Sequence, residues 1–157
     1  MSLVGSVMWV MPSKRERFLA DLRLRAKRMG FQVQLIKLQY PRARKELEGE
    51  RKSSVAYRLT RTDVSRDQHT SFASWRVLRC DTNASEGLCE GWGWALGERT
   101  LSAQALVKLN TLLQSLPDNV LGLESTPVHA SAYWREEEAL SLQSLHDLVN
   151  QIITLEL

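Results

Sequence analysis

The residues best suited to acid–base or metal chemistry are scattered along this sequence. The histidines, His69, His129 and His146, match no zinc-binding or catalytic spacing, and there is no glycine-rich phosphate loop. A metal-dependent nuclease would need carboxylates at strand ends, where the expected strands carry almost none. Cys80 and Cys89 fit neither a zinc site nor a disulfide framework, and we expect free thiols. We therefore expect no catalytic residue, metal or cofactor, and an enzyme is the least favoured hypothesis.

Positive charge is concentrated in the first half of the chain. Residues 1–80 contain 18 Lys and Arg against 7 Asp and Glu, a balance of +11. Residues 81–157 contain 3 against 11, a balance of −8. This asymmetry indicates either a basic surface for a polyanion or two poles that attract each other, for example across a homodimer.

The cations fall on a predicted helix over residues 13–29, a charged connection over 41–52 and a strand near 54–62. Rows of Lys and Arg neutralise backbone phosphates, so the favoured hypothesis is a nucleic-acid-binding module, for DNA or RNA. Glu46, Glu48 and Glu50 also lie within the charged connection, and their negative charge weakens the prediction that this segment binds phosphates. The predicted contact residues are Lys14, Arg15, Arg17, Arg23, Lys27, Arg28, Arg42, Arg44, Lys45, Arg51, Lys52, Arg58 and Arg61.

The second hypothesis is a non-enzymatic adaptor or assembly subunit. In this reading an arginine-bearing sheet face, or the basic helix, docks on an acidic protein surface or on the acidic half of a second copy. Trp75, Trp92 and Trp94 admit two interpretations, a platform for stacking bases or part of the hydrophobic core, and the usual burial of tryptophan favours the core.

The spacing of apolar residues predicts a single α+β domain over residues 1–157, with a mainly antiparallel sheet of four to six strands and two or three helices packed on one face. Ser13 and Glu16 form a capping box at the start of the first helix. Strands are predicted over 31–40, 54–62, 71–80 and 87–96 as an antiparallel meander. A helix that begins at Thr100 or Ser102 ends before Pro117.

The remaining segments complete the prediction. An extended segment over 120–133 precedes a final helix, with Glu136, Glu137 and Glu138 near its N-terminus. The apolar residues 3–11 are predicted to form a buried first strand. The run is too short to span a bilayer, and it lacks the leading positive charges of a signal peptide. We therefore expect a cytoplasmic protein without a membrane partner.

Overall fold

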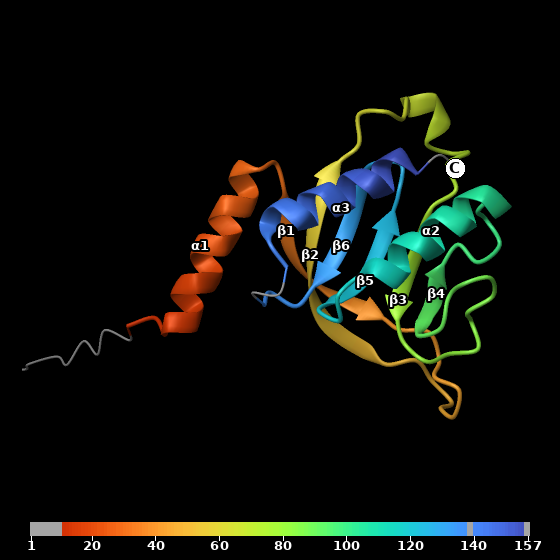
Figure 1. The fold of residues 1–157 in the computed structure, drawn as a ribbon, viewed down its shortest axis with the longest axis horizontal. Coiled ribbons are helices and arrows are strands. Elements are labelled where there is room, and N and C mark those ends of the chain that lie inside the picture. The colour runs from red at the N-terminus through yellow and green to blue at the C-terminus, as the bar shows by residue number, and fades with distance from the viewer. Residues whose placement is uncertain (1–10, 138–139, 156–157) are drawn as a thin grey trace, which may run out of the picture.

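The computed structural model describes residues 11–137 and 140–155, so the predicted first strand lies almost wholly outside the described residues. The predicted α+β class is confirmed, with three helices and six antiparallel strands in the described part of the chain (Figure 1). None of these helices is long and apolar enough to cross a membrane. The elements are α1 Lys14–Arg28, β1 Gln32–Gln39, β2 Arg51–Thr60, η1 Arg66–Gln68, β3 Trp75–Arg79, β4 Trp92–Leu96, α2 Ala103–Ser115, β5 Val120–Ser125, β6 His129–Trp134 and α3 Leu142–Thr154.

The sheet has the strand order β1-β2-β6-β5-β3-β4, so the predicted meander is wrong. Its two hairpins, β1–β2 and β3–β4, form as expected, but β5 and β6 separate them. The segment predicted as merely extended is therefore a hairpin at the centre of the sheet. Thr126 stabilises its turn, because the Thr126 hydroxyl oxygen accepts a hydrogen bond from the backbone amide of His129 at 3.1 Å.

The helices begin where side chains cap their free amides. Ser13 and Glu16 form the predicted capping box of α1, and Ser102 caps α2. Ser141 caps α3, which begins at Leu142, so Glu136 and Glu137 precede the helix and lie outside the first turn, where its dipole acts. The predicted role of the glutamates at this helix terminus is therefore wrong.

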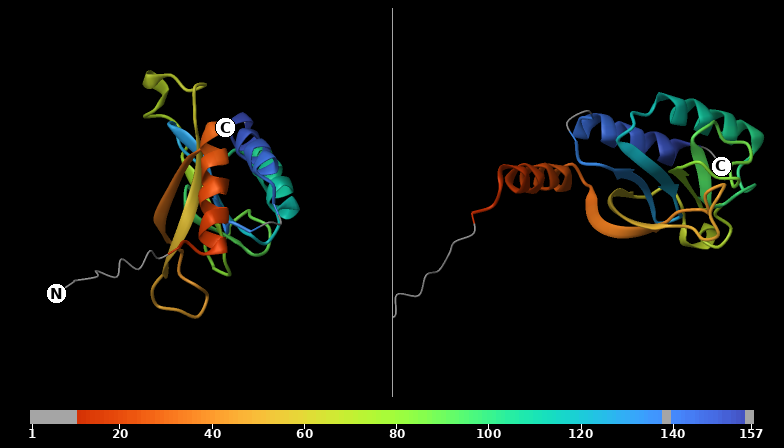
Figure 2. Two further views of the ribbon diagram at one scale, coloured as in Figure 1. Left: turned by 90° about the vertical axis from the view of Figure 1, so that its left-hand side faces the viewer. Right: turned by 90° about the horizontal axis from the view of Figure 1, so that it is seen from below.

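All three helices lie on one side of the sheet (Figure 2). α3 packs over β2, β6 and β5, and α2 lies towards the β3–β4 end of the sheet (Figure 1), while α1 lies beside β1 and inserts Leu22 and Ala26 into the same core. Trp75, Trp92 and Trp94 are 0%, 2% and 5% exposed within this core. The core interpretation of the three tryptophans is confirmed.

The opposite face of the sheet is not covered by a helix of the described chain, but β1 and β2 curl strongly around it (Figure 2). The curl brings the segment after β1 against the β3–β4 connection, where Ala43 forms an isolated antiparallel bridge with Thr82. Gly93 permits this approach, because a side chain there would collide with Thr82. A second, smaller core forms under the curl from Leu38, Ala56, Leu78 and Tyr133.

Candidate functional site

Four cations occupy the solvent-facing side of α1. Lys14, Arg17, Lys27 and Arg28 are exposed, and none forms an ion pair with another residue in the described ranges. At 3.6 residues per turn they fall within an arc of about 140°, opposite the buried side of the helix. We call these four residues the α1 basic face. Arg15 is also exposed, but lies on the first turn outside this arc.

Arg23 does not belong to the α1 basic face, although the sequence predicted it as a phosphate contact. Its Nε donates to Glu136 Oε1 at 2.7 Å, and Nη2 donates to Oε2 at 2.6 Å. The Tyr57 hydroxyl donates to the same Oε1 at 2.7 Å. The hydrogen bonds to Glu136 raise the pKa of Arg23. Arg23 therefore anchors α1 to the segment after β6.

The cations of the charged connection have local partners. Arg44 pairs with Asp81 at 2.9 Å and Lys52 pairs with Glu50 at 2.9 Å, while Arg51 Nε donates to Gln39 at 2.8 Å. The structure also places this connection and α1 at opposite ends of the long axis of the molecule (Figure 1). It does not bring the predicted contacts into one stripe. The cations of the connection with no ion pair among the described residues are Arg42, Lys45 and Arg51.

Arg61 is buried in the protein, which sequence reasoning did not foresee. Its Nη2 donates to Ser125 Oγ at 2.7 Å, and Nη1 donates to Asp63 at 2.8 Å and to the backbone carbonyl of Ile153 at 3.2 Å. Burial lowers its pKa despite the nearby Asp63 carboxylate. Arg61 therefore links β2, β5 and the end of α3, and is not available to a partner.

Arg58 lies on the opposite side of the sheet, within a row of polar residues that crosses four strands. The direct neighbours in this row are Arg58 on β2, Ser131 on β6, Glu124 on β5 and Arg76 on β3. We call it the polar row. It lies on the face without a helix, next to the smaller core.

Glu124 is the centre of the polar row and is only 2% exposed. Arg76 Nε donates to Glu124 Oε2 at 2.6 Å, and His129 Nε2 lies 2.9 Å from Oε1. Burial alone would raise the pKa of Glu124, but His129 and Arg76 together lower it to about 2. Glu124 is therefore a carboxylate held between two cationic or hydrogen-bonding side chains.

Other groups of the polar row have no partner. Ser131 Oγ and Arg58 Nε are buried and make no hydrogen bond in the described structure, although Arg58 Nη1 donates to Gln34 at 2.6 Å. The Tyr133 hydroxyl, on the same face, lies beside the Glu124 carboxylate and helps to lower its pKa. Leaving a buried polar group unpaired costs about 1–3 kcal/mol, so such groups are rare and mark places where something else binds or where the fold is strained.

Sequence reasoning missed Glu124 and His129 as a pair. The signal was a lone acidic residue in an apolar run, followed by Ser-Thr-Pro and then His129. Read as a tight hairpin, this pattern places Glu124 and His129 on one face of adjacent strands. In an isolated sequence the same pattern is equally typical of a loop.

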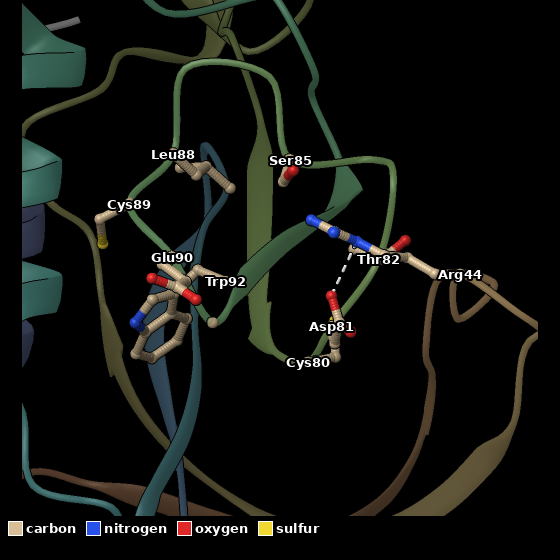
Figure 3. A pocket seen from close by; sticks show the side chains of 10 residues that line it. Arg44, Cys80, Asp81, Thr82, Ser85, Leu88, Cys89, Glu90 and Trp92 are labelled. Atoms are coloured by element: carbon tan, nitrogen blue, oxygen red, sulfur yellow. Dashed lines mark ion pairs between the residues drawn. The ribbon is translucent and has the colours of Figure 1, made fainter.

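The pocket of Figure 3 lies between the charged connection and the β3–β4 hairpin and has a volume of about 580 Å³. Arg44 reaches across it to Asp81, and Glu90 adds a second negative charge. Cys80 and Cys89 both line it as free thiols, and burial raises the pKa of Cys80 to about 11. The pocket therefore offers neither an excess of positive charge nor a reactive thiolate at neutral pH.

Comparison with protein-family models, with curated proteins and with solved structures finds no match to this chain. No group of three or more His, Cys, Asp or Glu in the described ranges could hold a metal ion. The functional argument therefore depends on the α1 basic face.

Proposed function

We propose that this protein binds nucleic acid through the α1 basic face. The observation that carries the proposal is that four exposed cations on one side of a helix lack acidic partners in the described structure, whereas many other arginines of the basic half have them. Four arginines pair with the acidic half of the same chain, namely Arg23, Arg44, Arg76 and Arg79, with Glu136, Asp81, Glu124 and Asp118.

The geometry of α1 supports a phosphate backbone as the ligand. From Arg17 to Arg28 the helix rises about 16 Å, which matches roughly five phosphates along one strand of duplex DNA. α1 lies at the edge of the molecule, with its outer side clear of the rest of the described chain (Figure 2). Contacts of this kind carry no base specificity, so we expect binding without strong sequence preference.

A charge-matched pair of triple variants tests the proposal. We expect Arg17→Gln, Lys27→Gln and Arg28→Gln together to weaken binding of a short duplex roughly 10–100-fold near 50 mM salt, because three phosphate contacts are lost. The slope of log K against log salt should fall by about 3. Fluorescence anisotropy at several salt concentrations measures both quantities.

The control carries the same charge change at the other end of the molecule. Arg42→Gln, Lys45→Gln and Arg51→Gln together should leave affinity within about threefold, because the connection lies far from α1 in the molecule (Figure 1) and charges are screened over a Debye length of about 14 Å at 50 mM salt. Absence of wild-type binding to DNA and RNA at low salt, or an equal loss in both triple variants, would contradict the proposal.

A second copy of the chain is the alternative partner, and the edge of β1 favours it. β1 pairs with β2 on one side and with no strand of the described chain on the other. Leu35 on this edge strand is 70% exposed. Unprotected edge strands are templates for pairing, and an antiparallel β1–β1 contact would close a two-fold dimer.

Sedimentation velocity tests this alternative. We expect a dimer at concentrations of about 100 μM that Leu35→Lys converts to monomer, because the two substituted positions would face each other with like charge. Leu47→Lys is the matched control, since Leu47 is 92% exposed in the charged connection, away from the edge of β1. A wild-type monomer at every concentration would exclude the edge-strand dimer.

A further inference from the structure

The centre of the α1 basic face is apolar. Leu24 lies on the side of α1 opposite the buried residues of the helix, and it is 49% exposed. Ala20, about one turn earlier, is exposed as well. On a helix of about 3.6 residues per turn, Leu24 lies about 60° from Lys27 in one direction and about 40° from Arg28 in the other. Cations therefore lie on both sides of an apolar centre.

This arrangement fits a helix that enters a groove better than a helix that lies across the phosphates. The two edges of a DNA groove carry the phosphates, and the floor of the groove is formed by the edges of the bases. A helix inserted into a groove therefore needs cations at its flanks and an apolar or small side chain at its centre. A helix that only neutralises phosphates would bind better with a cation in place of Leu24. The position of Leu24 therefore favours insertion into a groove.

The width of α1 selects which groove it can enter. An α-helix with its side chains is about 10–12 Å wide, and the major groove of B-form DNA is about 12 Å wide. The DNA minor groove, about 6 Å wide, is too narrow for a helix, and so is the deep major groove of A-form RNA. α1 stands at one end of the molecule, with its outer side clear of the sheet and of the other helices (Figure 2).

We propose that α1 binds in the major groove of duplex DNA, with Leu24 against the 5-methyl group of a thymine and the cations of the α1 basic face on the phosphates that border the groove. This inference rests on the proposed function, because it names the nucleic acid and the groove that the α1 basic face binds. The thymine methyl group is an apolar feature of the major groove, so Leu24 gives a weak preference for A·T pairs. The overall sequence preference stays low, since no bidentate hydrogen bond to a base is involved.

The test compares duplexes of one A·T-rich sequence, made as DNA, as DNA with deoxyuridine in place of thymidine, and as RNA. Fluorescence anisotropy at one salt concentration measures their affinities for the full chain. We expect the RNA duplex to bind at least about fivefold more weakly than the DNA duplex, because its major groove excludes the helix. Deoxyuridine should weaken DNA binding about twofold to fivefold, which is the effect of losing the burial of one methyl group.

Leu24→Ala tests the contact from the protein side. The variant should bind the thymidine duplex about threefold to tenfold more weakly than the wild type, and it should no longer distinguish thymidine from deoxyuridine. The slope of log K against log salt should stay unchanged, because no phosphate contact is lost. Val107→Ala is the control, since it truncates a side chain that is 66% exposed on α2. It should alter neither the affinity nor the difference between the duplexes.

Two results would overturn the proposal and leave the proposed function intact. Equal affinity for the DNA and RNA duplexes would place α1 outside the major groove. An affinity for DNA that deoxyuridine and Leu24→Ala both leave unchanged would mean that Leu24 does not contact the bases. Absence of wild-type binding to every duplex would instead overturn the proposed function and this proposal together. The triple variant of α1 separates the two cases further, because it changes the salt slope and Leu24→Ala does not.

Discussion

Replacing Glu124 with alanine should destabilise the protein by about 3–5 kcal/mol, the usual cost of removing one partner from a buried ion pair. The substitution leaves Arg76 and His129 on the sheet face without the carboxylate that both contact. Urea denaturation at neutral pH measures the loss. Glu48→Ala, at an exposed glutamate in the charged connection, should change the free energy of unfolding by less than about 0.5 kcal/mol.

The pKa of Glu124 predicts how the stability of the protein depends on pH. The pKa of Glu124 is about 2 in the folded protein, against about 4.3 in an unfolded chain. A lowered folded pKa means that the stabilisation is complete above pH 5 and is lost as the pH falls towards 2. The difference corresponds to about 3 kcal/mol, which Arg76, His129 and Tyr133 together provide against the opposing effect of burial.

Glu124→Gln isolates this contribution, because glutamine keeps the shape of the side chain but does not titrate. We expect the variant to be less stable than the wild type at pH 7 and to lose less stability between pH 5 and pH 2.5. An equal loss of stability between pH 5 and pH 2.5 in the two proteins would show that another carboxylate controls acid unfolding.

Local signals in the sequence predicted the helices well and the sheet order poorly. Ser13 with Glu16, and Ser102, marked helix starts because capping depends on neighbouring residues alone. The position of β5 and β6 between β2 and β3 depends on which strands find each other across long stretches of chain. Short spacing between β2 and β3 favoured direct pairing, and nothing local to either strand indicated the hairpin that separates them.

The basic residues of the candidate site show the same difference between features that depend on local sequence and features that depend on distant partners. Exposed cations such as Arg17 and Arg28 lie where helical periodicity places them, on the side away from Leu22 and Ala26. Arg23 has nearly the same sequence context, yet it is drawn inward by a glutamate 113 residues away. Counting charge along a sequence cannot separate these cases, because the partner is supplied by the tertiary fold.

Glu136 is the partner that decides where α1 lies, and Glu136→Ala should destabilise the protein by about 2–4 kcal/mol. We place the effect below that of Glu124 because Glu124→Ala removes the carboxylate from two basic side chains, Arg76 and His129, whereas Glu136→Ala removes it from Arg23 alone. Tyr57 also loses its hydrogen bond, and Tyr57→Phe alone should cost about 1 kcal/mol. Arg25→Ala, which breaks only the exposed pair with Asp21, should cost less than about 0.5 kcal/mol.

The location of the effect distinguishes anchoring of α1 from general destabilisation. In Glu136→Ala the backbone amides of α1 should exchange with solvent faster than those of β5 and β6, since only apolar contacts, such as those of Leu22 and Ala26, then hold the helix against the core. Combining Arg23→Met with Glu136→Leu should restore most of the stability, because a buried ion pair replaced by apolar side chains of similar size is often neutral or stabilising. That double variant also keeps Lys14, Arg17, Lys27 and Arg28 in place, so it should bind duplex DNA like the wild type if Arg23 anchors the helix and does not contact phosphate. A double variant that is stable and yet has lost DNA affinity would indicate that Arg23 itself contacts phosphate.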